Sequence, residues 1–163
     1  TCNGGYVMRA WYDIISLEPH SRRIDEAGIV ESRATVRELI EREKGRGIPV
    51  DRIFLAGFSQ GGAVVCATAL THPEPLAGLI ALSTYIPSAE LVQREATPAN
   101  RALHVFAAHG NGDDVVSPAL GRAARDLLTQ HGCAVEWHEY PMPHALCMEE
   151  VEHIGRWLRA RLA

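Results

Sequence analysis

Ser59 lies in the segment Gly57-Phe58-Ser59-Gln60-Gly61-Gly62, between apolar runs at 52–56 and 63–67. A serine between a buried strand and a helix is typical of a nucleophile elbow, a sharp turn that presents a hydroxyl at the top of a sheet. We expect the glycines at 57 and 61 to make room for a strained serine backbone. The N–H groups that open the following helix favour negative charge nearby. The pattern therefore predicts nucleophilic attack beside half of an oxyanion-binding site.

Such a serine needs a histidine to accept its proton and a carboxylate to orient that histidine, in the chain order Ser, Asp, His. The apolar run 103–108 leads into a glycine-rich loop that contains Asp113, and the alternating run 134–139 leads into a proline-framed loop that contains His144. Sites of parallel sheets lie where the strands end. The sequence therefore predicts that Ser59, Asp113 and His144 meet.

Alternatives to these assignments exist in the sequence. Asp113 also suits a turn residue that caps a helix starting near Pro118. Asp114 is its rival, and we assign the turn or cap role to Asp114. Of the eight histidines, His144 alone follows the final strand. Six others fall at helix ends, on polar faces or within strands, where we expect structural roles: His20, His72, His104, His131, His138 and His153.

The elements that must position these residues alternate along the chain. Hydrophobic periodicity predicts a first helix at 24–44, ended by Gly45 and Gly47. Residues 87–100 are expected to form a long irregular surface loop. The last helix is predicted to bury one stripe of apolar side chains, formed by Leu146, Val151, Ile154 and Leu158. Strands are predicted at 52–57, 78–83, 103–108 and 134–139, and further helices at 60–71, 118–131 and 146–161. This order predicts an α/β fold in one domain, 1–163, with a mostly parallel sheet covered by helices on both faces.

Several segments together resemble a known family. They are the Gly-Phe-Ser-Gln-Gly-Gly motif, Ile80-Ala81-Leu82-Ser83-Thr84-Tyr85, His109-Gly110 with Asp113 and Val115-Val116, Tyr140-Pro141-Met142 with His144, and the opening Asn3-Gly4-Gly5-Tyr6 with Ala10-Trp11-Tyr12-Asp13. The chain resembles, over nearly its whole length, the bacterial carboxylesterases of the acyl-protein thioesterase (phospholipase/carboxylesterase) family. This resemblance implies the α/β-hydrolase fold, with Ser59 as nucleophile, Asp113 as acid, His144 as base and the Gln60 N–H as one oxyanion donor.

The chain also departs from the pattern of that family. Its members begin with a strand and a His-Gly-Leu-Gly type loop that supplies a second oxyanion donor, and nothing in this sequence matches them. We therefore expect an N-terminally truncated fold, the C-terminal part of a longer parent. Loss of one donor typically lowers turnover by about two to three orders of magnitude. The strand at 52–57 would become an apolar edge, which predicts a homodimer, strand exchange, or an N-terminal segment folded over the edge.

Composition narrows the remaining classes of function. The net charge of −4, with scattered basic residues, argues against nucleic acid as a partner. No apolar stretch reaches the roughly 18 residues that span a bilayer, so no stable membrane insertion is expected. The four cysteines lack metal-binding spacing and are expected to be free thiols in a reducing cytoplasm. The proposed chemistry calls for no cofactor and no metal.

The sequence thus predicts a serine esterase that hydrolyses short-chain carboxylic esters, with a small-molecule ester as its partner. One alternative is thioesterase or lysophospholipase activity on longer acyl chains. Another is a catalytically impaired chain that acts only as an assembly module. Tyr12, Tyr85, Met142 and Leu146 are candidate walls of the substrate pocket, because they lie close in sequence to the site loops.

Overall fold

A computed structural model of the 163-residue chain describes residues 9–13 and 25–162. Its centre is a four-stranded sheet in the order β1-β2-β3-β4. The strands are β1 (Phe54–Phe58), β2 (Gly78–Leu82), β3 (His104–Gly110) and β4 (Ala134–Tyr140). Every neighbouring pair is parallel. All four strands therefore end at the same edge of the sheet.

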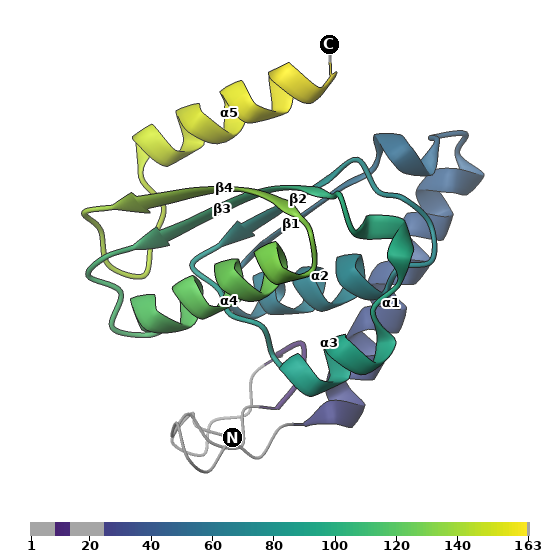
Figure 1. The fold of residues 1–163 in the computed structure, drawn as a ribbon, viewed down its shortest axis with the longest axis horizontal. Coiled ribbons are helices and arrows are strands. Elements are labelled where there is room, and N and C mark those ends of the chain that lie inside the picture. Colours follow the sequence, from purple (N-terminus) through teal and green to yellow (C-terminus); the bar gives the residue numbers. More distant parts are fainter. Residues whose placement is uncertain (1–8, 14–24, 163) are drawn as a thin grey trace.

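Helices cover both faces of this sheet (Figure 1). Four of them, α1 (Glu26–Gly45), α2 (Ser59–Thr71), α3 (Ala89–Glu95) and α4 (Pro118–Gln130), lie on one side, and α5 (Met148–Leu162) lies on the other. Two short 3₁₀ turns, η1 (Val50–Arg52) and η2 (Pro98–Asn100), complete the described elements. The predicted α/β fold with helices on both faces is confirmed.

Two apolar clusters hold the layers together. Alternate residues of a strand point to opposite faces, and β3 shows this clearly. Val105 and Ala107 join the cluster beneath α1 to α4, while Phe106 and Ala108 join the cluster beneath α5. Both faces of the strand are buried, which explains why the sequence there is a continuous apolar run.

The first helix begins and ends where local chemistry allows it. The Asp25 carboxylate accepts a hydrogen bond from the Gly28 N–H at 2.9 Å, which caps the helix N-terminus. The helix ends at Gly45, and Gly47 adopts a φ of +89°, a conformation that favours glycine. The predicted end at these two glycines is confirmed.

Two of the predicted elements are wrong in extent or type. Residues 87–100 are not an irregular loop, because Ser88 caps the short helix α3 by accepting a hydrogen bond from the Leu91 N–H at 3.2 Å. Leu91 is completely buried, so packing stabilises this short helix. The third strand also continues past Ala108 through His109 and Gly110, which pair with β4.

The predicted buried stripe of the last helix is wrong in half of its positions. Leu146 lies before α5 and is 51% exposed, and Val151 is 47% exposed. Ile154 and Leu158 do pack against the cluster beneath α5, which contains Trp157. Glu150 is also buried, and burial raises the pKa of its carboxyl above the ordinary value.

β1 forms one edge of the described sheet, as predicted. A hollow of about 300 Å³ runs beside it, lined mainly by apolar side chains that include Trp11, Leu39, Ile40, Phe54 and Ala56. Dimerisation through this edge stays a prediction.

Two further observations concern the described residues. None of their helices combines the length and apolarity that crossing a bilayer requires. Cys66, Cys133 and Cys147 are free thiols, as predicted. Cys2 and His20 lie outside the described residues.

Candidate active site

Ser59 is the first residue of α2 and has a φ of +54°. A non-glycine residue in this left-handed region stores strain of about 1–3 kcal/mol. A Cβ atom at Gly57 would lie 2.5 Å from the Gly61 carbonyl carbon, and one at Gly62 would lie 2.6 Å from the Thr84 Cβ. These two glycines therefore let strand, turn and helix approach closely enough to form the elbow.

Gly61 does not have the steric role that the sequence suggested. A Cβ there would lie 3.4 Å from the Trp11 Nε1, which is ordinary contact. The elbow is instead supported from the segment that follows β2, because the Thr84 hydroxyl donates a hydrogen bond to the Ser59 carbonyl oxygen at 2.6 Å. The segment after β2 thus helps to fix the serine backbone.

The structure brings the three predicted side chains into one hydrogen-bonded chain. The Ser59 Oγ lies 3.0 Å from the His144 Nε2, and the His144 Nδ1 lies 2.7 Å from the Asp113 Oδ2. The Phe58 ring packs against the His144 imidazole, with ring centroids 4.7 Å apart. These contacts hold the imidazole between the hydroxyl and the carboxylate.

Asp113 acts both as the turn residue and as the partner of the histidine. Its Oδ1 accepts hydrogen bonds from the Val115 N–H at 3.0 Å and the Val116 N–H at 2.8 Å, while its Oδ2 faces His144. Asp114 is exposed. Asp113 therefore fills both the turn role expected of Asp114 and the role of histidine partner.

The Asp113 carboxylate is electrostatically stabilised although its side chain is buried. Burial raises the pKa of this group, but the hydrogen bonds from His144 and from the two backbone N–H groups outweigh that effect. The pKa of Asp113 lies below its ordinary value of 3.8. The carboxylate thus stays ionised and can stabilise a positively charged imidazole.

His109 is a site residue that sequence reasoning missed. Its side chain is 1% exposed, and its Nε2 lies 3.4 Å from the Asp113 Oδ2 and 2.9 Å from the Val116 carbonyl oxygen. A Cβ at Gly121 would overlap the imidazole ring, so α4 packs directly on it. The signal in the sequence is the spacing of four residues between His109 and Asp113 across a strand end.

Gln60 fastens the segment 9–13 to the elbow. Its Oε1 accepts a hydrogen bond from the Trp11 N–H at 3.0 Å, and its Nε2 donates to the Tyr12 carbonyl oxygen at 2.8 Å. The backbone N–H of Gln60 belongs to the first turn of α2, where no intrahelical acceptor exists. The side chain is thus engaged, while the N–H predicted as an oxyanion donor faces the N-terminal end of the helix.

The four candidate pocket residues have different surroundings in the structure. The Tyr12 and Tyr85 hydroxyl oxygens lie 2.5 Å apart. Met142 is buried in the cluster beneath α5, and its carbonyl oxygen accepts a hydrogen bond from the Gly112 N–H at 3.2 Å. Leu146 is exposed. The structure thus pairs the two tyrosines and gives Met142 a role in holding the loop before Asp113.

Comparison with protein families matches residues 1–162 to the family described as Phospholipase/Carboxylesterase. The chain belongs to this family. The phospholipase/carboxylesterase family consists of carboxylic ester hydrolases with the α/β-hydrolase fold, so the predicted enzyme class and fold are confirmed.

Similar relatives and solved structures agree with this assignment. The chain is 43% identical to acyl-protein thioesterase 1 of Neurospora crassa, covering 99% of this chain and 69% of that protein. It is 39% identical to acyl-protein thioesterase 1 of Mycosarcoma maydis, covering 97% and 71%. The crystal structure of Arabidopsis thaliana SOBER1 matches all of this chain and 79% of that one, with a TM-score of 0.91 at 31% identity. The two thioesterases are fungal, so these relatives support the family and not its bacterial branch.

Proposed function

We propose that the chain is a serine carboxylesterase in which Ser59 is the nucleophile, His144 the general base and Asp113 the orienting acid. The observation that carries this proposal is the pair of contacts at 3.0 Å and 2.7 Å that joins the hydroxyl, the imidazole and the carboxylate. A serine hydroxyl is a weak nucleophile until a positioned base accepts its proton. The strained elbow directs that hydroxyl toward the end of the sheet.

The reaction follows from these contacts. The Ser59 proton passes to the His144 Nε2 as the Oγ bonds to the ester carbonyl carbon, and negative charge gathers on the carbonyl oxygen. The Gln60 N–H stabilises that oxygen. The tetrahedral intermediate then expels the alcohol, which takes the proton from His144. Water repeats both steps on the acyl-enzyme and releases the acid and the free Ser59.

Short-chain carboxylic esters are the substrates that we propose first. A second candidate, a thioester or an ester with a longer acyl chain, is favoured by the names of the fungal relatives. A panel of p-nitrophenyl esters of increasing chain length, together with an acyl thioester, separates the two. Values of kcat/KM that rise with chain length, or that are higher for the thioester, would overturn the short-chain proposal.

Replacement of Ser59 tests the catalytic proposal. The Ser59→Ala variant should lose at least about a thousandfold in kcat on p-nitrophenyl acetate while keeping its circular dichroism spectrum. A fluorophosphonate probe should label the unaltered chain and not the variant. Ser117→Ala is the matched control, because Ser117 is exposed and its side chain makes no capping bond. An unaltered chain that resists the probe would favour the alternative of a non-catalytic assembly module.

We propose in addition that the β1 edge pairs with the β1 edge of a second copy. The unpaired backbone groups of an edge strand favour such pairing. The apolar hollow beside β1 would be covered at the same time. The expectation of weakened turnover stays a prediction, which the kcat of the unaltered chain measures.

A further inference from the structure

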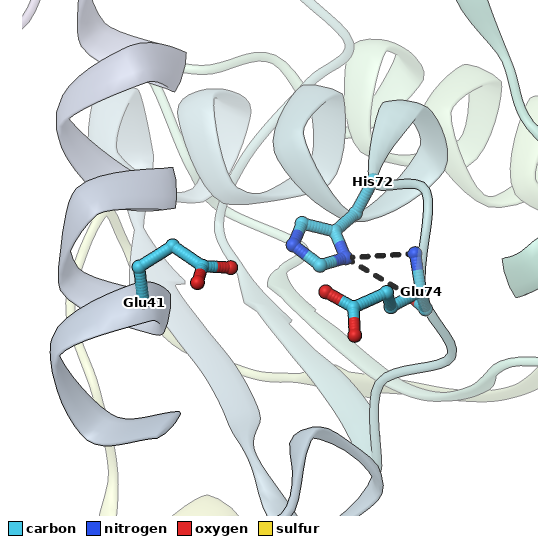
Figure 2. A group of neighbouring side chains, drawn as sticks. All are labelled: Glu41, His72 and Glu74. Atoms are coloured by element: carbon cyan, nitrogen blue, oxygen red, sulfur yellow. Dashed lines mark hydrogen bonds between the residues drawn. The ribbon is translucent and has the colours of Figure 1, made fainter. Parts of the chain in front are cut away.

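We propose that Glu41, His72 and Glu74 form a binding site for a divalent transition metal ion of the Zn²⁺ class. Glu41 belongs to α1, whereas His72 and Glu74 follow the end of α2 (Figure 2). One ligand atom of each side chain lies within 4.8 Å of the others. The site lies outside the Ser59 site and would join the first helix to the loop between α2 and β2.

Backbone atoms of Glu74 hold the His72 ring in place. The residue is 2% exposed, and its Nδ1 lies 3.0 Å from the Glu74 carbonyl oxygen and 3.2 Å from the Glu74 backbone nitrogen. When the Nδ1–H donates to this oxygen, the Nε2 carries the lone pair. In metal-bound histidines, the ring nitrogen that does not bind the metal usually donates its N–H to a carboxylate, a backbone carbonyl or water, and this bond fixes the tautomer.

The outward nitrogen of His72 points toward the cluster. Figure 2 shows the ring between the two glutamates, with its free nitrogen directed at Glu41. Within the described residues, no hydrogen bond reaches that Nε2. This nitrogen is therefore open to a metal ion that lies between the two glutamates.

The donor set selects the class of ion. Imidazole nitrogen and carboxylate oxygen are both ligands of zinc, which in open sites has three protein ligands and a water, whereas Ca²⁺ and Mg²⁺ prefer oxygen alone. Zinc bonds of about 2.0–2.2 Å require the three ligand atoms to move closer together. The Glu41 and Glu74 side chains are 61% and 41% exposed, so both can change rotamer to do this.

Lys44 competes with the ion for the same carboxylates. Its ammonium lies 2.8 Å from the Glu41 Oε1 and also bonds the Glu74 Oε1. The two carboxylates are therefore already gathered around a cation. A divalent ion brings twice the charge and adds a bond to His72, so it would displace the ammonium. Metal binding and the Lys44 ion pairs are mutually exclusive.

Zn²⁺ titration followed by calorimetry tests this proposal. The full chain is used with Cys147→Ser, because a partly exposed thiol also binds zinc. Glu74→Gln and His72→Gln should each weaken the affinity at least about tenfold, since each removes one of three ligands. Lys44→Met should strengthen it several-fold by removing the competing cation. Glu38→Gln, an exposed change on the same helix, is the matched control and should have no effect.

A diffraction experiment locates the ion directly. Crystals soaked in ZnCl₂ and measured at the zinc edge should show an anomalous peak bonded to the His72 Nε2. Unchanged affinity in Glu74→Gln, together with a peak elsewhere such as beside Glu136 and His138, would overturn the proposal. Because Glu74 and Lys44 are partly exposed, both variants should fold even if His72→Gln does not.

Discussion

At the scale of single residues, Asp113 connects the stability of a loop to the chemistry of the site. One of its oxygens accepts hydrogen bonds from two backbone N–H groups, and the other accepts a hydrogen bond from the imidazole N–H. His109 packs against the same oxygen from the other side. A change at Asp113 therefore alters loop geometry and histidine orientation together.

Asp113→Asn should lower kcat by about three to four orders of magnitude, because an amide no longer fixes the tautomer of His144. Ester hydrolysis by the purified variant measures this loss. Asp114→Asn serves as the control, since Asp114 is exposed and should keep its activity. Equal losses in the two variants would contradict the assignment of Asp113.

The Asp113→Asn substitution should also change how the stability of the fold depends on pH. The pKa of Asp113 is lower in the folded chain than the ordinary 3.8. Its ionised form therefore contributes stability above pH 3.8, and this contribution disappears as the pH falls through the folded pKa. Urea unfolding at several pH values should show a shallower loss of stability below about pH 4 in Asp113→Asn.

The sequence predicted Ser59, Asp113 and His144 because chain order and strand ends constrain them strongly. It missed His109, because the contact with Asp113 depends on β3 continuing for two residues more than its apolar run indicates. It also missed the cluster around His72. Glu41 and His72 belong to different helical segments, and only the packing of α1 on α2 brings them together.

At the scale of elements, the elbow depends on close approach of backbone atoms. A methyl group at Gly57 would overlap the first turn of α2, whereas one at Gly61 would meet only the Trp11 indole at 3.4 Å. The two glycines that flank Ser59 symmetrically in the sequence are therefore under different steric constraints.

Gly57→Ala should destabilise the fold by about 1–3 kcal/mol or more and abolish ester hydrolysis, because strand and helix must separate. Gly61→Ala should keep the fold, since that position has room. Thermal unfolding and p-nitrophenyl acetate turnover measure both effects. A Gly57→Ala chain as active as the parent would show that the elbow is not closely packed.

The sequence predicted the positions of the long helices and of the strands, but it missed the short helix α3 and the buried face of α5. The helix α3 has seven residues and depends on the Ser88 cap and on burial of Leu91, neither of which is visible in a periodic pattern. The stripe of α5 was misplaced because Trp157 and the buried Glu150 face the sheet, while Val151 faces solvent.

At the scale of the whole molecule, the edge strand β1 is where we expect two copies to associate. Its backbone edge and the adjoining apolar hollow would be covered together if two copies paired there. Ala56 is exposed and lines this hollow, so it reports on the edge without touching the Ser59 contacts.

The chain should sediment as a dimer at micromolar concentration, and Ala56→Lys should convert it to a monomer, because charge on an edge strand opposes pairing. Analytical ultracentrifugation distinguishes the two states. Asp51→Lys, an exposed change just before the strand, controls for added charge. A parent chain that stays monomeric at all concentrations would exclude the dimer.

The parallel arrangement of the strands also bears on how this protein can change. Ser59, Asp113 and His144 lie where β1, β3 and β4 end, whereas the two apolar clusters lie between the strands and the helices. Loops at that rim can be exchanged while the interior keeps its volume and packing. Selection for new substrates can therefore proceed on one end of the molecule with little penalty in folding, which favours divergence of specificity within a single architecture.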